Sequence, residues 1–295
     1  MFVVYPSMAD CDRRTFIKSA LAFGTGLAGL SGAAHAGPEN SLSPDRKGVL
    51  VDTTACIGCR NCEWACKTAH ALPTPGVETY EDASVFSAMR RPDETALTVV
   101  NRCDETSVKV QCMHCDHPAC VSVCIVGAFS KKEDGSVVWD TDKCIGCRYC
   151  MAACPFQVPA FEYRKALQPK IMKCDFCFER RKDGGLPACV EACPAEALTY
   201  GPRTELIRVA KERVARAPAR YVKHVYGEYE VGGTSWMYLA GRDFKDLQFP
   251  KLGKSPAPGI SESIQHGIFA YFVPPVALYG LLGVLMWNSK DDGKE

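Results

Sequence analysis

Sixteen of the eighteen cysteines in this 295-residue chain fall into four groups of four. The first and third groups share the spacing C-x2-C-x2-C-x3-C, and proline follows the third and fourth groups at Pro155 and Pro194. In chain order, the quartets are Cys56, Cys59, Cys62 and Cys66; Cys112, Cys115, Cys120 and Cys124; Cys144, Cys147, Cys150 and Cys154; and Cys174, Cys177, Cys189 and Cys193. So many closely spaced thiols predict that metal centres, rather than an apolar core alone, organise residues 48–202.

The spacing favours iron-sulfur clusters over single metal ions. Gaps of two residues turn successive thiolates toward one compact centre, and C-x2-C-x2-C-x3-C-P is the bacterial ferredoxin pattern. The alternative is four structural zinc sites in a membrane-anchored scaffold, since zinc also takes four thiolates, usually from two separated C-x2-C pairs. Three cysteines at two-residue gaps plus a fourth suit a cubic cluster better, so the sequence predicts four 4Fe-4S clusters.

The segments between the quartets indicate how they pair. Between quartets two and three, two short apolar runs flank Asp134-Gly135, which is a hairpin signal. This connection predicts one continuous two-cluster unit. Quartets one and four then supply the halves of a second unit, in which residues 48–52 and 195–200 must close on each other. We therefore expect an α+β fold with two ferredoxin-like two-cluster units.

In two-cluster ferredoxins the fourth cysteine of each motif binds the neighbouring cluster. Applied here, this rule exchanges one ligand within each pair of quartets. The predicted ligand sets are Cys56, Cys59, Cys62 and Cys193 (set one); Cys112, Cys115, Cys120 and Cys154 (set two); Cys144, Cys147, Cys150 and Cys124 (set three); and Cys174, Cys177, Cys189 and Cys66 (set four).

Four other residues are weaker candidates. Cys11 and Cys103 have no partner at ligand spacing, so we expect no ligand role for them. His114 and His117 lie inside quartet two and could replace a thiolate, as histidines do in Rieske centres. That quartet already holds four cysteines, which argues against histidine ligation.

The amino terminus resembles a twin-arginine export signal over residues 1–36. Arg13-Arg14 and Phe16 precede an apolar stretch, and Ala34-His35-Ala36 forms a cleavage site. A chance Arg-Arg pair is the alternative. The signal predicts a mature chain that begins at Gly37 and lies outside the cytoplasm, exported with its clusters already built. Metal-bound thiolates also explain abundant cysteine there without disulfides.

The carboxyl terminus contains an uncharged run of twenty-one residues, 267–287. At 1.5 Å per residue a helix of this length spans about 31 Å, enough to cross the hydrocarbon layer. We therefore predict a transmembrane helix over residues 263–288, kinked at Pro274-Pro275, and a cytoplasmic tail over 289–295. A buried core helix is the alternative. His266, just outside this run, is expected to lie at the interface, with quinone contact as the second possibility.

The remaining sequence narrows the function further. The formal net charge is +1, which gives no electrostatic support for nucleic acid binding. Residues 37–202 are expected to form the four-cluster domain, and 203–262 an extension packed on it, with a helix over 204–217 and a strand-like run ending at Ala240. The sequence contains no nucleophile elbow, phosphate loop or dinucleotide fingerprint, so we expect an electron-transfer subunit without catalysis of its own.

With these features the chain resembles the four-cluster subunits of membrane-bound oxidoreductases, including the beta subunits of formate dehydrogenase and dimethyl sulfoxide reductase. Within that group it is most similar to the exported ferredoxin-type subunit of the membrane-bound uptake nickel-iron hydrogenase. The matching stretches are Gln111-Cys-Met-His-Cys115, Cys147-Arg-Tyr-Cys-Met-Ala-Ala-Cys-Pro155, Gly185-Leu-Pro-Ala-Cys-Val-Glu-Ala-Cys-Pro194, Leu247-Gln-Phe-Pro-Lys-Leu252 and Ser263-Ile-Gln-His266.

The resemblance implies a role and partners. Electrons from hydrogen oxidised in the hydrogenase large and small subunits would pass through four 4Fe-4S clusters to a multi-spanning quinone-binding subunit. The chain would lie on the periplasmic face of the bacterial inner membrane, anchored in the lipid bilayer. A molybdopterin enzyme such as formate dehydrogenase is the alternative catalytic partner. The family's pairing of quartets agrees with the pairing argued above.

Overall fold

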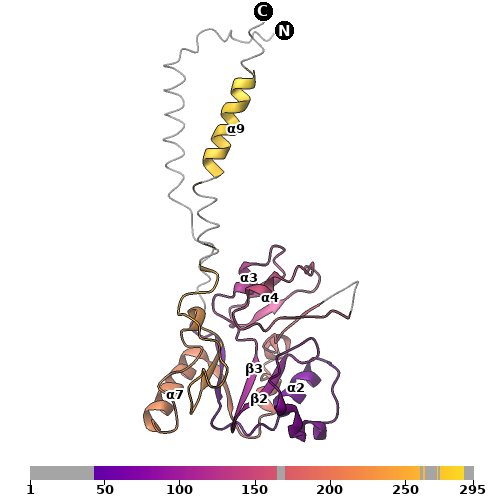
Figure 1. Ribbon diagram of the computed structural model, residues 1–295, viewed down its shortest axis with the longest axis vertical. Helices are drawn as coiled ribbons and strands as arrows, with labels where there is room; N and C mark the ends of the chain where they lie inside the picture. Colours follow the sequence, from indigo (N-terminus) through magenta and orange to yellow (C-terminus); the bar gives the residue numbers. More distant parts are fainter. Residues whose placement is uncertain (1–42, 165–169, 260–261, 263–270, 272, 289–295) are drawn as a thin grey trace, which may run out of the picture. The chain divides into compact units, whose positions relative to one another are not determined.

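The computed structural model describes residues 43–164, 170–259, 262, 271 and 273–288 (Figure 1). Residues 42–262 form one compact unit, and the two ends of the chain belong to a second. The predicted export signal, Cys11, His266 and the tail over 289–295 all lie outside the described residues.

A three-stranded sheet joins the beginning of the compact unit to its end. β1 (Lys47–Asp52) pairs antiparallel with β8 (Leu198–Pro202) and parallel with β9 (Trp236–Leu239). Leu50 lies opposite Thr199, which confirms that the segments flanking quartets one and four close on each other. The strand-like run ending at Ala240 is also confirmed, and its place beside β1 is an addition that its sequence did not predict.

The sheet is buried on both faces because its side chains alternate between two apolar clusters. On one face Leu50 and Met237 pack against Leu206 and Ala210 of α7 (Arg203–Arg216). This helix confirms the one expected over residues 204–217. On the other face Val49, Val51 and Trp236 pack toward cysteines of quartets one and four. One face of the sheet therefore packs against the cysteine-rich half of the compact unit.

Three hairpins complete the strands. β4 (Phe129–Lys131) and β5 (Val137–Trp139) form the hairpin predicted between quartets two and three. Its turn is closed by Asp134, whose Oδ1 accepts a hydrogen bond from the Ser136 backbone N–H at 2.9 Å. The longer hairpin of β2 (Thr98–Cys103) and β3 (Thr106–Gln111), between quartets one and two, was not predicted. β6 (Ala160–Phe161) pairs with β7 (Ile171–Met172).

Each quartet has at least one cysteine in a short helix (Figure 1). The α-helices are α2 (Asn61–Ala69), α3 (Ala119–Ser122), α4 (Tyr149–Ala153), α5 (Phe178–Lys182) and α6 (Ala188–Glu191). The 3-10 helices are η2 (Val77–Glu81), η3 (Ala83–Ser87) and η4 (Glu230–Gly232). The mixture of helices and antiparallel strands agrees with the α+β class.

The structure describes part of the predicted carboxyl-terminal helix. Within the predicted span 263–288 the structure describes α9 (Val273–Asn288), of 16 residues, together with Tyr271. Among the described residues, no helix combines the length and the apolar character needed to cross a membrane. The other residues of the predicted span lie outside the described part of the chain.

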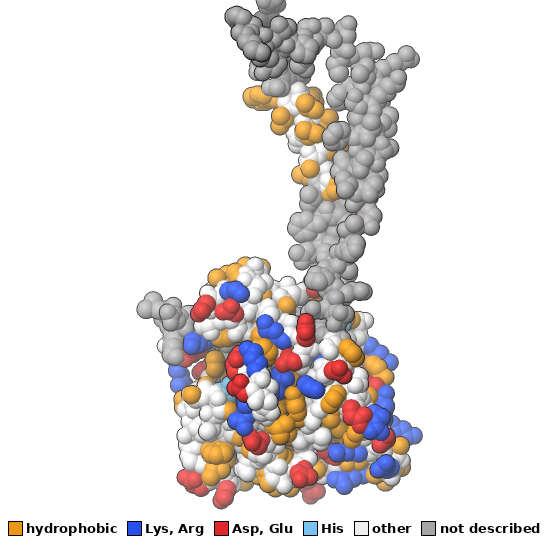
Figure 2. All heavy atoms as spheres, turned by 180° about the vertical axis from the view of Figure 1, so that it is seen from behind, with side chains coloured by type: hydrophobic (Ala, Val, Ile, Leu, Met, Phe, Trp, Pro, Cys, Tyr) orange, Lys and Arg blue, Asp and Glu red, His pale blue; other side chains and the backbone are white. Residues whose placement is uncertain are grey.

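Charges of both signs are mixed on the surface of the compact unit. On the face shown in Figure 2, Lys and Arg side chains lie among Asp and Glu side chains, with hydrophobic side chains scattered between them. This distribution agrees with the near-zero net charge of the sequence. The face shown has no extended basic patch of the kind that binds nucleic acid.

Candidate iron-sulfur centres

The first and third quartets fold into the same backbone turn at two distant places. Gly58 and Gly146, between the first two cysteines of each motif, have φ of 74° and 71°. Arg60 and Arg148 both adopt φ 64° and ψ 8° and begin helices α2 and α4. This left-handed turn curls the chain around the site, so that the thiols of one motif point toward a common centre. The repeated sequence C-I-G-C-R thus specifies its conformation locally.

The structure brings together the four thiols of set one. Cys56, Cys59, Cys62 and Cys193 line one cavity, whose apolar wall includes Val51 and Leu198 of the central sheet. Cys193 reaches this cavity because β8, which follows it, pairs with β1, which precedes Cys56. The structure therefore places the Cys193 thiol beside the first three thiols of quartet one.

The four thiols of set two meet in a second cavity. Cys112, Cys115, Cys120 and Cys154 line it together with Val137, Phe156 and Lys173. Cys154 comes from the third quartet, on the other side of the β4–β5 hairpin. Both cavities thus combine three thiols of one quartet with one thiol of another.

Electrostatic contacts group the thiols of sets three and four in the same way. Burial, together with Cys144, Cys147 and Cys124, raises the pKa of the Cys150 thiol to about 11. Burial also raises the pKa of Cys189 to about 11, with Lys109 opposing this change and Cys66 and Cys177 adding to it. For Cys174, burial raises the pKa, and Cys66 is the thiol that adds most to the effect.

The donor sets fit a cationic iron-sulfur core. Thiolates are the ligand form, yet burial and mutual repulsion disfavour four of them in one cavity unless a metal compensates their charge. Backbone amides point at the sulfurs: Ala128 N–H donates to Cys124 Sγ at 3.2 Å and Phe176 N–H to Cys174 Sγ at 3.4 Å. N–H groups directed at the sulfurs are among the features that tune such clusters. When bound, the clusters would supply one-electron chemistry, and the protein would supply ligands and electrostatic surroundings.

Comparison with known proteins leads to the same cofactor. Residues 103–203 match the family model described as a 4Fe-4S dicluster domain. A protein of Nitratidesulfovibrio vulgaris is 47% identical, covering 84% of this chain and 69% of the relative. The hydrogenase-2 operon protein HybA of Escherichia coli O157:H7 is 36% identical over an alignment that covers 95% of this chain and 97% of HybA. The iron-sulfur subunit of the nitrate-inducible formate dehydrogenase of Escherichia coli is 32% identical over 79% of this chain and 80% of that subunit.

The chain belongs to this family of ferredoxin-type iron-sulfur subunits. Its cofactors are 4Fe-4S clusters, and its role is to relay electrons. The family-model match covers quartets two, three and four, while the longer relatives extend over most of the chain.

Two lysines lie among the thiols of this iron-sulfur subunit, and the sequence analysis did not single them out. The Lys109 ammonium lies 4.3 Å from the centroid of the Trp236 ring and donates to Gln111 Oε1 at 2.9 Å. Lys173 donates to the backbone carbonyl of Cys174 at 2.9 Å. Burial lowers the pKa of Lys109, but the Cys189 and Cys62 thiolates outweigh it, so the pKa is raised and the group stays charged.

Histidine ligation gains no support from the structure. His114 is fully buried, and its Nδ1 accepts a hydrogen bond from the Val137 backbone N–H at 2.9 Å. Its ring packs against Phe176 with centroids 5.1 Å apart. Burial, with Lys173 and Lys131 nearby, holds its pKa well below the usual value. His114 therefore acts as a neutral packing and hydrogen-bonding residue next to quartet two. Cys103 is buried in the same apolar cluster as Val49, Val51 and Trp236.

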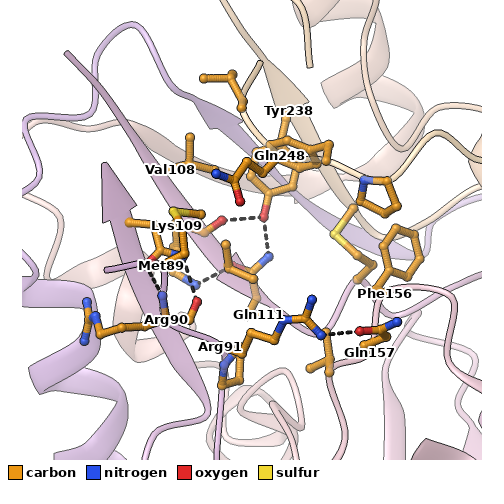
Figure 3. Close-up of a pocket in the computed structure, with 18 of the residues that line it drawn as sticks. Met89, Arg90, Arg91, Val108, Lys109, Gln111, Phe156, Gln157, Tyr238 and Gln248 are labelled. Carbon is orange, nitrogen blue, oxygen red and sulfur yellow. Dashed lines mark hydrogen bonds between the residues drawn. The ribbon is translucent and has the colours of Figure 1, made fainter. Parts of the chain in front are cut away.

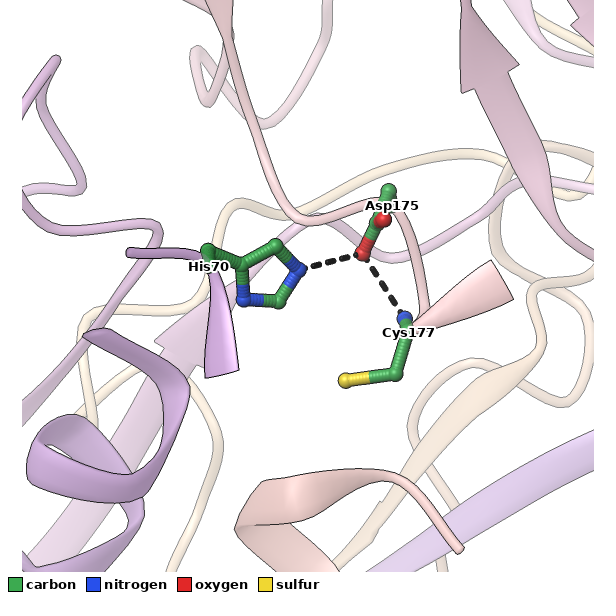
Figure 4. A group of neighbouring side chains, drawn as sticks. All are labelled: His70, Asp175 and Cys177. Atoms are coloured by element: carbon green, nitrogen blue, oxygen red, sulfur yellow. Dashed lines mark hydrogen bonds and ion pairs between the residues drawn. The ribbon is translucent and has the colours of Figure 1, made fainter. Parts of the chain in front are cut away.

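His70 is a neighbour of set four that the sequence analysis missed. Its Nε2 lies 2.8 Å from Asp175 Oδ1, and its Nδ1 lies 2.8 Å from the Cys66 carbonyl oxygen and 3.8 Å from Cys66 Sγ (Figure 4). Burial lowers its pKa, but Asp175 and Cys66 raise it to about 11. The signal available in the sequence was its position four residues after Cys66 on one helix. The ligand atoms of His70, Asp175 and Cys177 lie close enough together to bind a metal ion. The Cys177 thiol, however, is already assigned to the predicted set four.

A further cavity adjoins the thiol sets without containing them. It has a volume of about 300 Å³ and lies between β3, the segment after Cys154 and residues 247–250 (Figure 3). The Tyr238 hydroxyl accepts from Gln111 Nε2 at 2.7 Å and donates to the Lys109 carbonyl at 2.9 Å. Arg91 reaches across the opening to Gln157. These contacts connect β9 to β3 beside sets one and four.

Proposed function

We propose that the sixteen quartet cysteines bind four 4Fe-4S clusters in the exchanged sets one to four. The observation that carries this assignment is the pair of cavities in which Cys193 joins quartet one and Cys154 joins quartet two. The thiols of sets three and four group likewise by their mutual effects on pKa.

The contacts between sets support an order for the relay. Set one adjoins set four, because Cys62 and Cys189 interact. Set four adjoins set two, because Cys174 and Cys112 lie in one apolar cluster with Leu97. Set two adjoins set three through Cys120 and Cys150. Electrons would therefore travel between the clusters in the order one, four, two, three, in whichever direction the partners impose.

The two ends of this order reach the surface. Ile57 follows Cys56 of set one and is 63% exposed, and Ile145 follows Cys144 of set three and is 62% exposed. Exposed apolar side chains beside a redox centre are suited to a protein interface. We infer that one end faces a catalytic subunit and the other a membrane subunit, and that this chain performs no catalysis itself.

The catalytic partner is proposed to be a nickel-iron hydrogenase, since HybA is a hydrogenase-2 operon protein and aligns with nearly the whole chain. A formate dehydrogenase is the second candidate, supported by the similarity to its iron-sulfur subunit. The export signal in residues 1–36 and the apolar run over 267–287 support a place on the periplasmic face, anchored in the membrane beside a quinone-binding subunit. Purification of the native complex, with assay for nickel and molybdenum, distinguishes the two partners.

The ligand assignment is tested with Cys193→Ala and Cys103→Ala in the full chain. We expect about four clusters in the wild-type protein by iron and acid-labile sulfide analysis, and loss or conversion of one cluster in Cys193→Ala. Cys103→Ala, a buried cysteine outside the sets, is the control and should retain all clusters. Zinc with no labile sulfide in the wild-type protein would refute the assignment.

The cluster affected by Cys193→Ala identifies its ligand set. If Cys193 serves set one, the altered electron paramagnetic resonance signal should match that of Cys56→Ala. A signal that instead matches Cys174→Ala would show that Cys193 binds within its own quartet.

A further inference from the structure

Two lysine side chains lie in the interior without a carboxylate at ion-pair distance among the described residues, and the more distant Asp175 carboxylate adds to the thiols that act on Lys173. Lys109 is 2% exposed and Lys173 is 7% exposed. Neither forms an ion pair with an aspartate or glutamate among the described residues. Lys109 Nζ has an amide oxygen and an indole ring beside it, and Lys173 Nζ has backbone carbonyls. A buried ammonium without a counter-charge is strongly disfavoured, so an anionic group must lie near each one.

The position of each lysine identifies that anionic group. Lys109 lines the cavity of set one, and the thiols that act on it are Cys62 of set one and Cys189 and Cys174 of set four. Lys173 lines the cavity of set two and contacts the backbone of Cys174, which belongs to set four. The two ammonium groups therefore lie at the junctions one–four and four–two of the relay.

A cation at such a junction affects electron transfer through simple electrostatics. A cluster held by four thiolates gains one negative charge on reduction. In an interior of low effective dielectric constant, a nearby fixed positive charge stabilises the reduced form more than the oxidised form. Local charge is one of the features that set the potentials of iron-sulfur clusters.

We propose that Lys109 and Lys173 set the reduction potentials of the clusters they separate, Lys109 raising those of sets one and four and Lys173 those of sets two and four. The inference rests on the proposed ligand sets. Both cations raise the reduction potential of the cluster in set four. The thiol Cys150 of set three is influenced by the other thiols of its own set, so set three serves as the internal reference.

The test is a redox titration of the full-length, cluster-loaded protein followed by electron paramagnetic resonance. In Lys109→Met the ratio of reduced to oxidised cluster at a fixed potential should fall about tenfold for sets one and four, equivalent to a shift of about 59 mV for a one-electron couple. Lys173→Met should shift sets two and four in the same direction. Set three should stay unchanged in both variants.

Two controls separate charge from packing. Lys109→Arg keeps the charge and should keep potentials close to wild type. Lys211→Met removes an exposed lysine of α7 that pairs with Glu228. This variant should change none of the four reduction potentials. If Lys109→Arg lowers the potentials as far as Lys109→Met, or if Lys109→Met changes none, the inference is wrong.

A second variant keeps the inference testable if the neutral substitution loses a cluster. Gln111→Glu would place a carboxylate against the Lys109 ammonium, at the position where Gln111 Oε1 now accepts at 2.9 Å. The new ion pair cancels the charge within a packed interior, so the potentials of sets one and four should fall. Unchanged potentials in Gln111→Glu would contradict the inference. Wild-type protein with fewer than four clusters would instead refute the ligand sets, which iron and sulfide analysis detects separately.

Discussion

Arg46 and Asp116, 70 residues apart in the sequence, form a part-buried ion pair with 2.9 Å between Arg46 Nη2 and Asp116 Oδ2. Lys131 and Arg203 lie 3.7 Å from the same carboxylate. One side chain next to quartet two therefore meets cations from the start of the chain, from the β4–β5 hairpin and from α7. Asp116 thereby links the extension after residue 202 to the cysteine-rich half.

Replacing this carboxylate should destabilise the compact unit. Asp116→Asn leaves three buried cations without their counter-charge, a change that costs about 3–5 kcal/mol when a buried pair is broken. We expect a clearly lower midpoint of thermal unfolding by circular dichroism. Glu205→Gln is the matched control, because Glu205 pairs with Arg208 at the exposed surface, where solvent screens the interaction. Equal midpoints in the two variants would contradict the linking role of Asp116.

Because the turn of the first quartet is left-handed, substitution of its glycine should destabilise the protein. Gly58 has φ of 74°, and a Cβ there would lie 2.5 Å from Ser107 Oγ, so Gly58→Ala introduces both strain and a clash. We expect a loss of about 1–3 kcal/mol and weaker occupancy of set one, measured by iron content after gel filtration. In contrast, Gly253→Ala should behave as wild type, since its Cβ would enter open space. Full iron content and stability in Gly58→Ala would count against the turn as a determinant of the site.

The β4–β5 turn predicts a dependence of stability on pH. Burial raises the pKa of Asp134, but hydrogen bonds from Ser136 and the nearby Arg181 outweigh it, so the folded-state pKa is lowered. A lowered folded-state pKa gives stability that is present above the unfolded-state value of about 3.9 and is lost as pH falls through the folded-state value. Asp134→Asn should therefore unfold more easily than wild type near neutral pH and differ less from it at acidic pH. Unfolding midpoints by circular dichroism at a series of pH values check this, and a constant difference would contradict it.

The proposed relay order predicts a separation of activities. Cys144 belongs to set three at one end of the order, so Cys144→Ala should abolish quinone reduction by the assembled complex. Reduction of an artificial dye by the catalytic partner should survive, because that reaction does not need the far end of the relay. The two assays on one membrane preparation make the measurement, with Cys103→Ala as control. Unchanged quinone reduction would refute a relay through set three.

Local sequence was sufficient for the features that depend on neighbouring residues. The four quartets, the Asp134-Gly135 hairpin and the helix of Arg203–Arg216 follow from spacing, turn chemistry and periodicity within short segments. Tertiary structure decided the rest. The Thr53 hydroxyl donates to the Leu239 carbonyl across 186 residues, and this pairing of β1 with β9 has no counterpart in any local pattern.

The same division applies to the sites. The sequence by itself predicts that the sixteen quartet thiols bind iron-sulfur clusters, because ligand type and spacing are contained in contiguous motifs. Only the tertiary structure placed Lys109, Lys173 and His70 among those thiols. A buried charge is recognisable only when the groups around it are known, and those groups come from distant segments that the central sheet brings together.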